Sequence, residues 1–288
     1  MIRDDYLNGL PNPHRPPIVL SLSGSDPSGG AGLEADLKVF ENLGAYGMAA
    51  PTLLTVQNTT GVRKVKTLEP AFFEEQVAFL LEDLFPDAIK IGAIGDRRML
   101  QALIRILARE RLAGVPVVID TVLGSTSGSP LFDMRGLEEF VERLLPRAAI
   151  ITPNVPEFDL LSGRVTTAEN APEHLHAFGE GKPYAILLKG GHFPGPPVDF
   201  LWQAGSLRRY PGERIATPHT HGTGCALASA LAAGLAAGMP LPDAVGAARE
   251  YVRNAILANP GLGNGRGPLG FSARRRAPGE TDARARNP

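Results

Sequence analysis

The sequence predicts an α/β fold in which a mostly parallel sheet carries helices on both faces. Short apolar runs such as residues 18–23 (IVLSLS) alternate along the chain with longer segments such as residues 30–43, where Leu33, Leu37 and Phe40 recur at helical spacing. Glycine and proline contribute 33 and 26 of the 288 residues, which indicates many tight loops. Strands that alternate with helices of this length require right-handed crossovers, and therefore a mostly parallel sheet.

The same patterns place the remaining elements in order. In the first half, we expect strands at 48–56, 61–67, 88–94 and 117–120, and helices at 70–84 and 98–111. In the second half, we expect helices near 136–145, 156–161 and 167–178, and strands at 149–152 and 184–188. Residues 200–202 and 207–210 predict an antiparallel hairpin at the sheet edge. Two helices rich in alanine and leucine, at 224–237 and 241–258, end the fold.

The domain organisation expected from the sequence is a single domain at residues 17–271, because no linker or internal repeat interrupts that span. Residues 1–16 are expected to form an extension before it. Residues 272–288 carry clustered charge and few apolar side chains, which predicts a disordered tail.

Composition excludes several classes of protein. The formal net charge is −1, so no global field attracts nucleic acid or an anionic membrane. No apolar run reaches the roughly 18 residues of a membrane span, and the first residues lack a signal-peptide core, so we expect a cytoplasmic protein. The single cysteine, Cys225, excludes an internal disulfide and a zinc site built on several thiolates.

A glycine-rich loop at residues 24–32 follows the first strand, on the edge of the sheet where α/β proteins bind ligands. Its glycines allow close approach of a ligand to the backbone, and the helix that follows offers unpaired amides. The loop matches neither the P-loop nor the dinucleotide fingerprint. A simple turn that starts a helix explains it equally well.

A second glycine loop, His219-Thr220-His221-Gly222-Thr223-Gly224-Cys225, precedes the first alanine-rich helix. Successive amides of Gly222, Thr223 and Gly224 can point at one anion, reinforced by the helix dipole. Cys225 falls in the first turn, where we expect the pKa of its thiol to drop below about 8.5. The alternative is a small buried apolar residue, although the preceding Gly-x-Gly favours a functional one.

Two further strand ends carry polar side chains. Asp120 ends one strand, and Asn154 and Glu157 follow the next, so their oxygens suit a magnesium ion that accompanies phosphates. Asn154 and Glu157 could equally form a helix capping box. Lys189, before two glycines at another strand end, could neutralise phosphate charge.

Together these parts predict phosphoryl transfer: an anion cradle, a magnesium locus, a cation, a base and a separate loop for the acceptor. Hydride transfer is disfavoured because no dinucleotide fingerprint is present. Serine hydrolase chemistry is disfavoured because the chain has no G-x-S-x-G motif.

These motifs resemble the hydroxymethylpyrimidine/phosphomethylpyrimidine kinases of thiamine biosynthesis. The resemblance runs in order through residues 24–62, 89–96, 117–131, 151–157, 187–192 and 219–238. It implies a ribokinase-like three-layer α/β/α sandwich. It also implies that ATP and Mg²⁺ serve to phosphorylate 4-amino-5-hydroxymethyl-2-methylpyrimidine and then its monophosphate, and that the chain forms a homodimer.

The resemblance also assigns roles to residues. It places Asp36 and Gln57 in hydrogen bonds to the aminopyrimidine, with Gly24 and Ala31 lining the same pocket. Gly222, Thr223 and Gly224 stabilise the transferring oxygens, and Cys225 accepts the hydroxymethyl proton. The resemblance further implies that the metal and the phosphates of ATP are bound by Asp120, Asn154, Glu157, Lys189 and Thr220.

Three positions depart from the pattern of the resembled family. Thr126 stands where many members have lysine, Ala93 replaces a frequent methionine, and Asn264 replaces a common histidine. Two other functions stay open at this stage. One is a pyridoxal or pyridoxine kinase, whose substrates have a similar ring, and the other is a sensor that binds the pyrimidine without catalysis.

Overall fold

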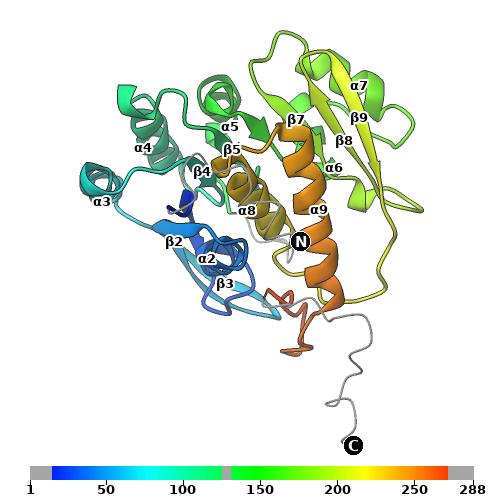
Figure 1. Ribbon diagram of the computed structural model, residues 1–288, viewed down its shortest axis with the longest axis horizontal. Coiled ribbons are helices and arrows are strands. Elements are labelled where there is room, and N and C mark those ends of the chain that lie inside the picture. The colour runs from blue at the N-terminus through cyan, green and yellow to red at the C-terminus, as the bar shows by residue number, and fades with distance from the viewer. Residues whose placement is uncertain (1–14, 125–130, 272–288) are drawn as a thin grey trace, which may run out of the picture.

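A mostly parallel sheet of nine strands forms the centre of the computed structural model, which describes residues 15–124 and 131–271 (Figure 1). The strands are β1 (Ile18–Ser25), β2 (Tyr46–Asn58), β3 (Gly61–Thr67), β4 (Ala88–Ile91), β5 (Val117–Ile119), β6 (Ile150–Ile151), β7 (Ala185–Leu188), β8 (Val198–Gln203) and β9 (Ser206–Pro211). Their order is β3-β2-β1-β4-β5-β6-β7-β8-β9. The central pairs from β2 to β7 are all parallel, which confirms the predicted sheet.

Both edges of the sheet are antiparallel. The β8–β9 hairpin pairs with β7 and closes one edge, as predicted. At the other edge β3 runs antiparallel to β2, because only Thr59 and Thr60 separate the two strands and so short a link cannot form a crossover.

Helices cover both faces. They are α2 (Gly32–Asn42), α3 (Pro70–Asp83), α4 (Arg97–Leu107), α5 (Leu137–Glu139), α6 (Val155–Ser162), α7 (Ala171–Gly179), α8 (Thr223–Ala236) and α9 (Leu241–Leu257). The helix expected near 136–145 is irregular: a 3₁₀ turn, α5, a π-helical segment at Phe140–Leu144 and a second 3₁₀ turn follow one another. No helix within residues 15–124 or 131–271 is long and apolar enough to cross a membrane.

The alternation of side chains along each strand produces two apolar cores. On β1, Leu20 and Leu22 face the core shared with α3, α4, α6 and α7, whereas Val19 faces the core shared with α2, α8 and α9. Successive side chains of a strand point to opposite faces, so one strand supplies both cores. This arrangement confirms the three-layer α/β/α sandwich.

Candidate active site

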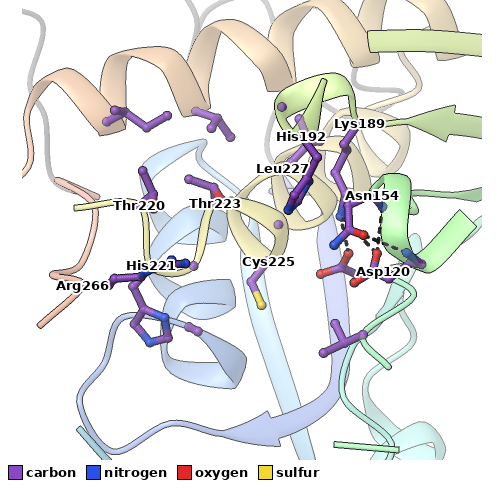
Figure 2. A pocket seen from close by; sticks show the side chains of 18 of the residues that line it. Asp120, Asn154, Lys189, His192, Thr220, His221, Thr223, Cys225, Leu227 and Arg266 are labelled. Atoms are coloured by element: carbon purple, nitrogen blue, oxygen red, sulfur yellow. Dashed lines mark hydrogen bonds and ion pairs between the residues drawn. The ribbon is translucent and has the colours of Figure 1, made fainter. Parts of the chain in front are cut away.

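A cleft of about 1580 Å³ opens at the carboxyl edge of the parallel strands. Every residue that the sequence analysis placed in a site lines this cleft, with the exception of Asp36. Figure 2 shows Asp120, Asn154 and Lys189 on one side of the pocket and Thr220 on the other, with Cys225 between them. The topology explains this convergence, because consecutive parallel strands end at the same edge of the sheet.

The two glycine loops pack directly against each other. Gly222 has φ of +85° and is the N-cap of α8, and a Cβ atom there would lie 1.8 Å from the carbonyl oxygen of Gly30. Gly32 has φ of +60° and begins α2. Only glycine allows this backbone conformation together with so close an approach. The loop at residues 24–32 therefore starts a helix and also forms part of the cleft wall.

Asp26 and His221 join these two loops through side chains. The Nε2 atom of His221 lies 2.7 Å from Oδ2 of Asp26, and the side-chain nitrogen of Gln57 lies 3.3 Å from the same Nε2 atom. Burial acts to raise the pKa of Asp26, but the hydrogen bonds from His221 and Ser28 outweigh it and hold the pKa below its ordinary value. Asp26 is therefore an ionised carboxylate at neutral pH. Through His221 it joins the two glycine loops on the side of the cleft where Gln57 lies.

The first turn of α8, which we call the anion cradle, presents backbone amides to the cleft. The amides of Gly224 and Cys225 have no carbonyl acceptor within the helix, since α8 begins at Thr223. A Cβ atom on Gly224 would lie 3.4 Å from both Oδ2 of Asp120 and Nζ of Lys189. The anion cradle therefore lies directly beside the Asp120 carboxylate and the Lys189 ammonium group, which line the wall of the cleft opposite the loop at residues 24–32.

Cys225 lies in this first turn, but the expected fall in its pKa is wrong. Burial raises the pKa of the thiol to about 11. The Lys90 ammonium acts in the other direction but does not compensate, and Asp36 and Asp120 add to the rise. Cys225 is consequently a neutral thiol near pH 7 in the absence of ligands.

Asp36 does not reach the cleft and is fully buried. Its carboxylate accepts hydrogen bonds from Lys90 at 2.8 and 2.9 Å, from Ser21 at 2.6 Å and from Ser229 at 2.7 Å. These partners occupy the carboxylate, so the structure does not support the expected direct contact with the pyrimidine. Lys90 was missed by the sequence analysis, although a lysine inside the apolar strand AIKI is an unusual signal.

On the wall opposite the loop at residues 24–32, the structure shows the capping box that the sequence offered as one of two alternatives. Asn154 and Glu157 form the capping box of α6, with bonds of 2.9 and 2.8 Å. Glu157 also lies 3.9 Å from Nζ of Lys189, which donates to Asp120 at 3.0 Å. Burial raises the pKa of Glu157, and the negative charge of Asp120 adds to this effect, although Lys189 opposes it.

These carboxylates fit Mg²⁺ only as part of a phosphate complex. No group of three or more His, Cys, Asp or Glu side chains suited to a metal occurs in the described ranges. Asp120 and Glu157 match the habit of Mg²⁺, which binds through one or two carboxylates together with phosphate oxygens and water. The donor set therefore suits a cation that arrives with a polyphosphate.

The three departures from the family pattern lie in different surroundings. Ala93 lines the cleft near Gly24, where a Cβ atom on Gly24 would lie 3.4 Å from the Ala93 methyl group. Asn264 is exposed and does not line the cleft. Thr126 lies outside the described residues.

The parallel sheet, the anion cradle at α8 and the paired carboxylates beside Lys189 define a small-molecule kinase of the ribokinase-like class. Residues 26–270 match the family model described as phosphomethylpyrimidine kinase, and the chain belongs to this family.

The chain is similar to individual proteins of thiamine biosynthesis and to a solved pyridoxal kinase. The hydroxymethylpyrimidine/phosphomethylpyrimidine kinase of Rhizobium meliloti is 40% identical over 257 residues, which is 88% of this chain and 96% of that protein. A thiamine biosynthesis bifunctional protein of Geobacter sulfurreducens is 39% identical over 257 residues, 87% of this chain and 51% of that protein. The ADP complex of Bacillus subtilis pyridoxal kinase superposes with a TM-score of 0.81 at 29% identity, covering 89% of this chain and 98% of that one.

Proposed function

We propose that this chain transfers the γ-phosphoryl group of ATP to 4-amino-5-hydroxymethyl-2-methylpyrimidine and then to the resulting monophosphate, as a step of thiamine biosynthesis. The observation that carries the proposal is the cradle of α8, which stands between Asp120 and Lys189 on one side and the loop at residues 24–32 on the other. In this geometry ATP would bind on the side of Asp120 and Lys189, and the acceptor would bind on the side of the loop at residues 24–32. The name of the Rhizobium meliloti relative, a hydroxymethylpyrimidine/phosphomethylpyrimidine kinase, supports the pyrimidine as the acceptor.

The nucleotide would bind along the wall of the cleft that Asp120, Asn154, Glu157 and Lys189 line. Lys189 and Asn154 would contact the phosphates of ATP from this wall and Thr220 would contact them from the other side of the pocket, while Asp120 and Glu157 would hold Mg²⁺ (Figure 2). The ion would neutralise charge on the β- and γ-phosphates. Lys189 would exchange its present ion pair with Asp120 for phosphate oxygens. The adenine nucleotide in the similar pyridoxal kinase of Bacillus subtilis supports ATP as the donor.

The acceptor wall would hold the pyrimidine. Gly24, Ala31 and Gln57 line this side of the cleft, and the amide of Gln57 can both donate to and accept from ring nitrogens or the exocyclic amine. Asp36 would act from behind the wall, through Ser229 and the position of α8. The amides of Gly222 and Gly224 would stabilise oxygens of the transferring phosphoryl group, and the amide of Thr223 would join them by exchanging the carbonyl of Thr220, to which it donates at 3.4 Å, for a phosphoryl oxygen.

Cys225 would serve as the base of the first phosphorylation, and only in its thiolate form. The thiolate would take the hydroxymethyl proton while the oxygen bonds to the γ-phosphorus and the bond to ADP breaks. The raised thiol pKa makes this form rare at neutral pH, so kcat of the first step should increase about tenfold per pH unit between about pH 6 and 8. A profile that is flat over this range contradicts the assignment.

A comparison of the two steps tests the base directly. The monophosphate already carries an ionised oxygen and needs no base, so Cys225→Ala should reduce kcat of the first step by about 10²–10⁴ and that of the second by far less. Calorimetric binding of the pyrimidine to this variant should be unchanged. Equal losses in both steps would remove Cys225 from the role of base.

The proposed function itself is tested by a coupled assay of ATP consumption with each acceptor. Turnover of both is expected, and turnover of neither would overturn the proposal. A pyrimidine sensor would bind the ligand and consume no ATP. Pyridoxal is the necessary comparison substrate, because the similar Bacillus subtilis structure is a pyridoxal kinase. We expect kcat/KM to be higher for the pyrimidine, since pocket hydrogen bonds dominate such discrimination.

We also propose a homodimer in the cytoplasm, based on the family resemblance and on the prevalence of two-fold assemblies. Light scattering after size-exclusion chromatography tests the first point, since a mass near 30.5 kDa would contradict it. Cell fractionation tests the second.

A further inference from the structure

The cleft is lined by five side chains with fixed positive charge, and four of them already have partners. The five are Lys189, Arg214, Arg249, Arg253 and Arg266. Lys189 donates to Asp120 at 3.0 Å, Arg249 to Asp199 at 2.6 Å and Arg253 to Glu213 at 3.3 Å. Arg214 donates to the carbonyl oxygens of Gly191, Phe193 and Gly195 at 2.8–3.2 Å. The charges of Lys189, Arg249 and Arg253 are thus paired with carboxylates, and the donors of Arg214 are used by carbonyl oxygens.

Arg266 is the exception among these cations. Its exposed side chain has neither a hydrogen bond nor an ion pair to another residue within 15–124 and 131–271. Its five guanidinium donors are therefore available to a ligand, as far as the described part of the chain shows. A positive charge without a counter-charge at the wall of a cleft is suited to an anion that arrives with the substrate.

The backbone around Arg266 is held in place on both sides. The amide of Gly267 donates to Nδ1 of His219 at 3.2 Å, and the amide of His221 donates to the carbonyl of Gly267 at 3.2 Å. On the other side, the amide of Gly265 donates to the hydroxyl of Thr59 at 3.4 Å. Arg266 therefore projects from a segment anchored to the loop that enters the anion cradle.

Arg266 lies on the acceptor side of the cradle. Figure 2 shows it beside Thr220 and His221, across the pocket from Lys189 and Asp120. The neighbouring Pro268 packs against the acceptor loop, because a Cβ atom on Gly30 would lie 3.3 Å from Pro268 and 2.5 Å from His221. Arg266 therefore comes from the same side of the pocket as the loop at residues 24–32, whereas Lys189 comes from the other side (Figure 2).

We propose that Arg266 pairs with the phosphate monoester of the acceptor in the second phosphorylation and so determines specificity for that step. The inference rests on the proposed function. An oxygen of the monoester forms a bond to the γ-phosphorus of ATP while the bond from that phosphorus to the ADP oxygen breaks, which yields a diphosphate and ADP. Two polyanions must approach each other in this step, and Arg266 offsets the charge of one of them.

The test compares Arg266→Gln and Arg266→Lys with the wild type on both acceptors. In Arg266→Gln, kcat/KM for the monophosphate should fall at least tenfold, whereas kcat/KM for the unphosphorylated pyrimidine and KM for ATP should change less than threefold. Arg266→Lys should recover part of the loss, because it keeps the charge without the planar fork. Arg63→Gln, an exposed arginine on β3 outside the cleft, is the matched control and should change neither acceptor.

The possible results separate the inference from the function on which it rests. Equal losses with both acceptors, or a raised KM for ATP alone, would overturn the role of Arg266 and leave the kinase activity established. No wild-type turnover of either acceptor would overturn the proposed function and this inference with it. Calorimetry with the monophosphate provides a second measurement: Arg266→Gln should bind it at least tenfold more weakly, and unchanged binding would also overturn the inference.

Discussion

At the scale of single residues, the chemistry of Cys225 follows from its burial. The raised pKa of about 11 leaves very little thiolate at pH 7.5, so iodoacetamide should alkylate Cys225 much more slowly than it alkylates free cysteine. The rate should increase with pH up to about 11. Cys225 is the only cysteine, so mass spectrometry of the intact chain measures this reaction without interference. Alkylation as fast as that of free cysteine would contradict the raised pKa.

The residue scale is also where sequence reasoning was least complete. The position of Cys225 at a helix start was predicted correctly, but the direction of its pKa shift was not, because the helix dipole can be read from the sequence and desolvation cannot. Asp36 was expected to hydrogen-bond the aminopyrimidine, whereas the fold buries it against Lys90. Burial depends on which elements pack together, and that information is not local in the sequence.

At the scale of elements, the Asp36 carboxylate links α2 to three others: Ser21 on β1, Lys90 on β4 and Ser229 on α8. Lys90→Met should lower the free energy of unfolding by about 3–5 kcal/mol, because it leaves this carboxylate buried without its counter-charge. Urea denaturation measures the change. Lys64→Met, at an exposed position of β3, is the control and should have an effect near zero.

A double variant distinguishes the buried charge from simple packing. Adding Asp36→Asn to Lys90→Met removes the unpaired carboxylate, so the double variant should regain part of the lost stability. If instead the two losses add, the ion pair is not the source of the effect. Ser229, which donates to Asp36, lies one helical turn after Cys225 on α8. The same variants therefore also test whether the Asp36–Ser229 hydrogen bond holds the Cys225 thiol in position.

The junction between the two glycine loops should depend on pH. The folded pKa of Asp26 lies below its ordinary value of 3.8, so its contribution to stability is present above about pH 4 and is lost as the pH falls through the folded value. Asp26→Asn should cost about 1.5–3 kcal/mol at pH 7, because an amide cannot keep both acceptor oxygens, of which Oδ2 holds Ala31 and His221 and Oδ1 holds Ser28. The difference in urea stability between wild type and variant should shrink below pH 4, and a constant difference would contradict the mechanism.

Elements themselves were largely predictable, for reasons visible in particular cases. The strand at Gly61–Thr67 and the start of the helix at Pro70 were predicted at their observed positions, because alternation and an N-terminal proline are local signals. The strand expected at 149–152 spans only Ile150–Ile151, although the amides of Ala149 and Thr152 still bond to β5. The irregular helix around Phe140 carries no local signal of its π-helical turn, since its apolar spacing is compatible with an ordinary helix.

At the scale of the whole molecule, the sheet topology converts separate motifs into one site. The cradle on α8 follows β9 in the chain, yet it meets loops from β1, β5, β6 and β7, because α8 packs back across the centre of the sheet. The sequence predicted that these loops share one edge. It did not predict the path of residues 261–268 between Thr59 and His219, because no periodic pattern marks that contact.

The domain limit proposed from the sequence predicts where the chain can be shortened. Leu269 and Phe271 are buried in the core under α2, α8 and α9, and the carbonyl of Phe271 accepts from the Tyr251 hydroxyl at 3.3 Å. A chain of residues 15–271 should therefore keep the melting temperature and the kinase activity of the full chain. A chain that stops at 262 should lose several kcal/mol of stability, since each buried side chain contributes about 1.5–3 kcal/mol. Calorimetric melting of both measures this, and a large loss already in the 15–271 chain would move the domain boundary into residues 1–14 or 272–288.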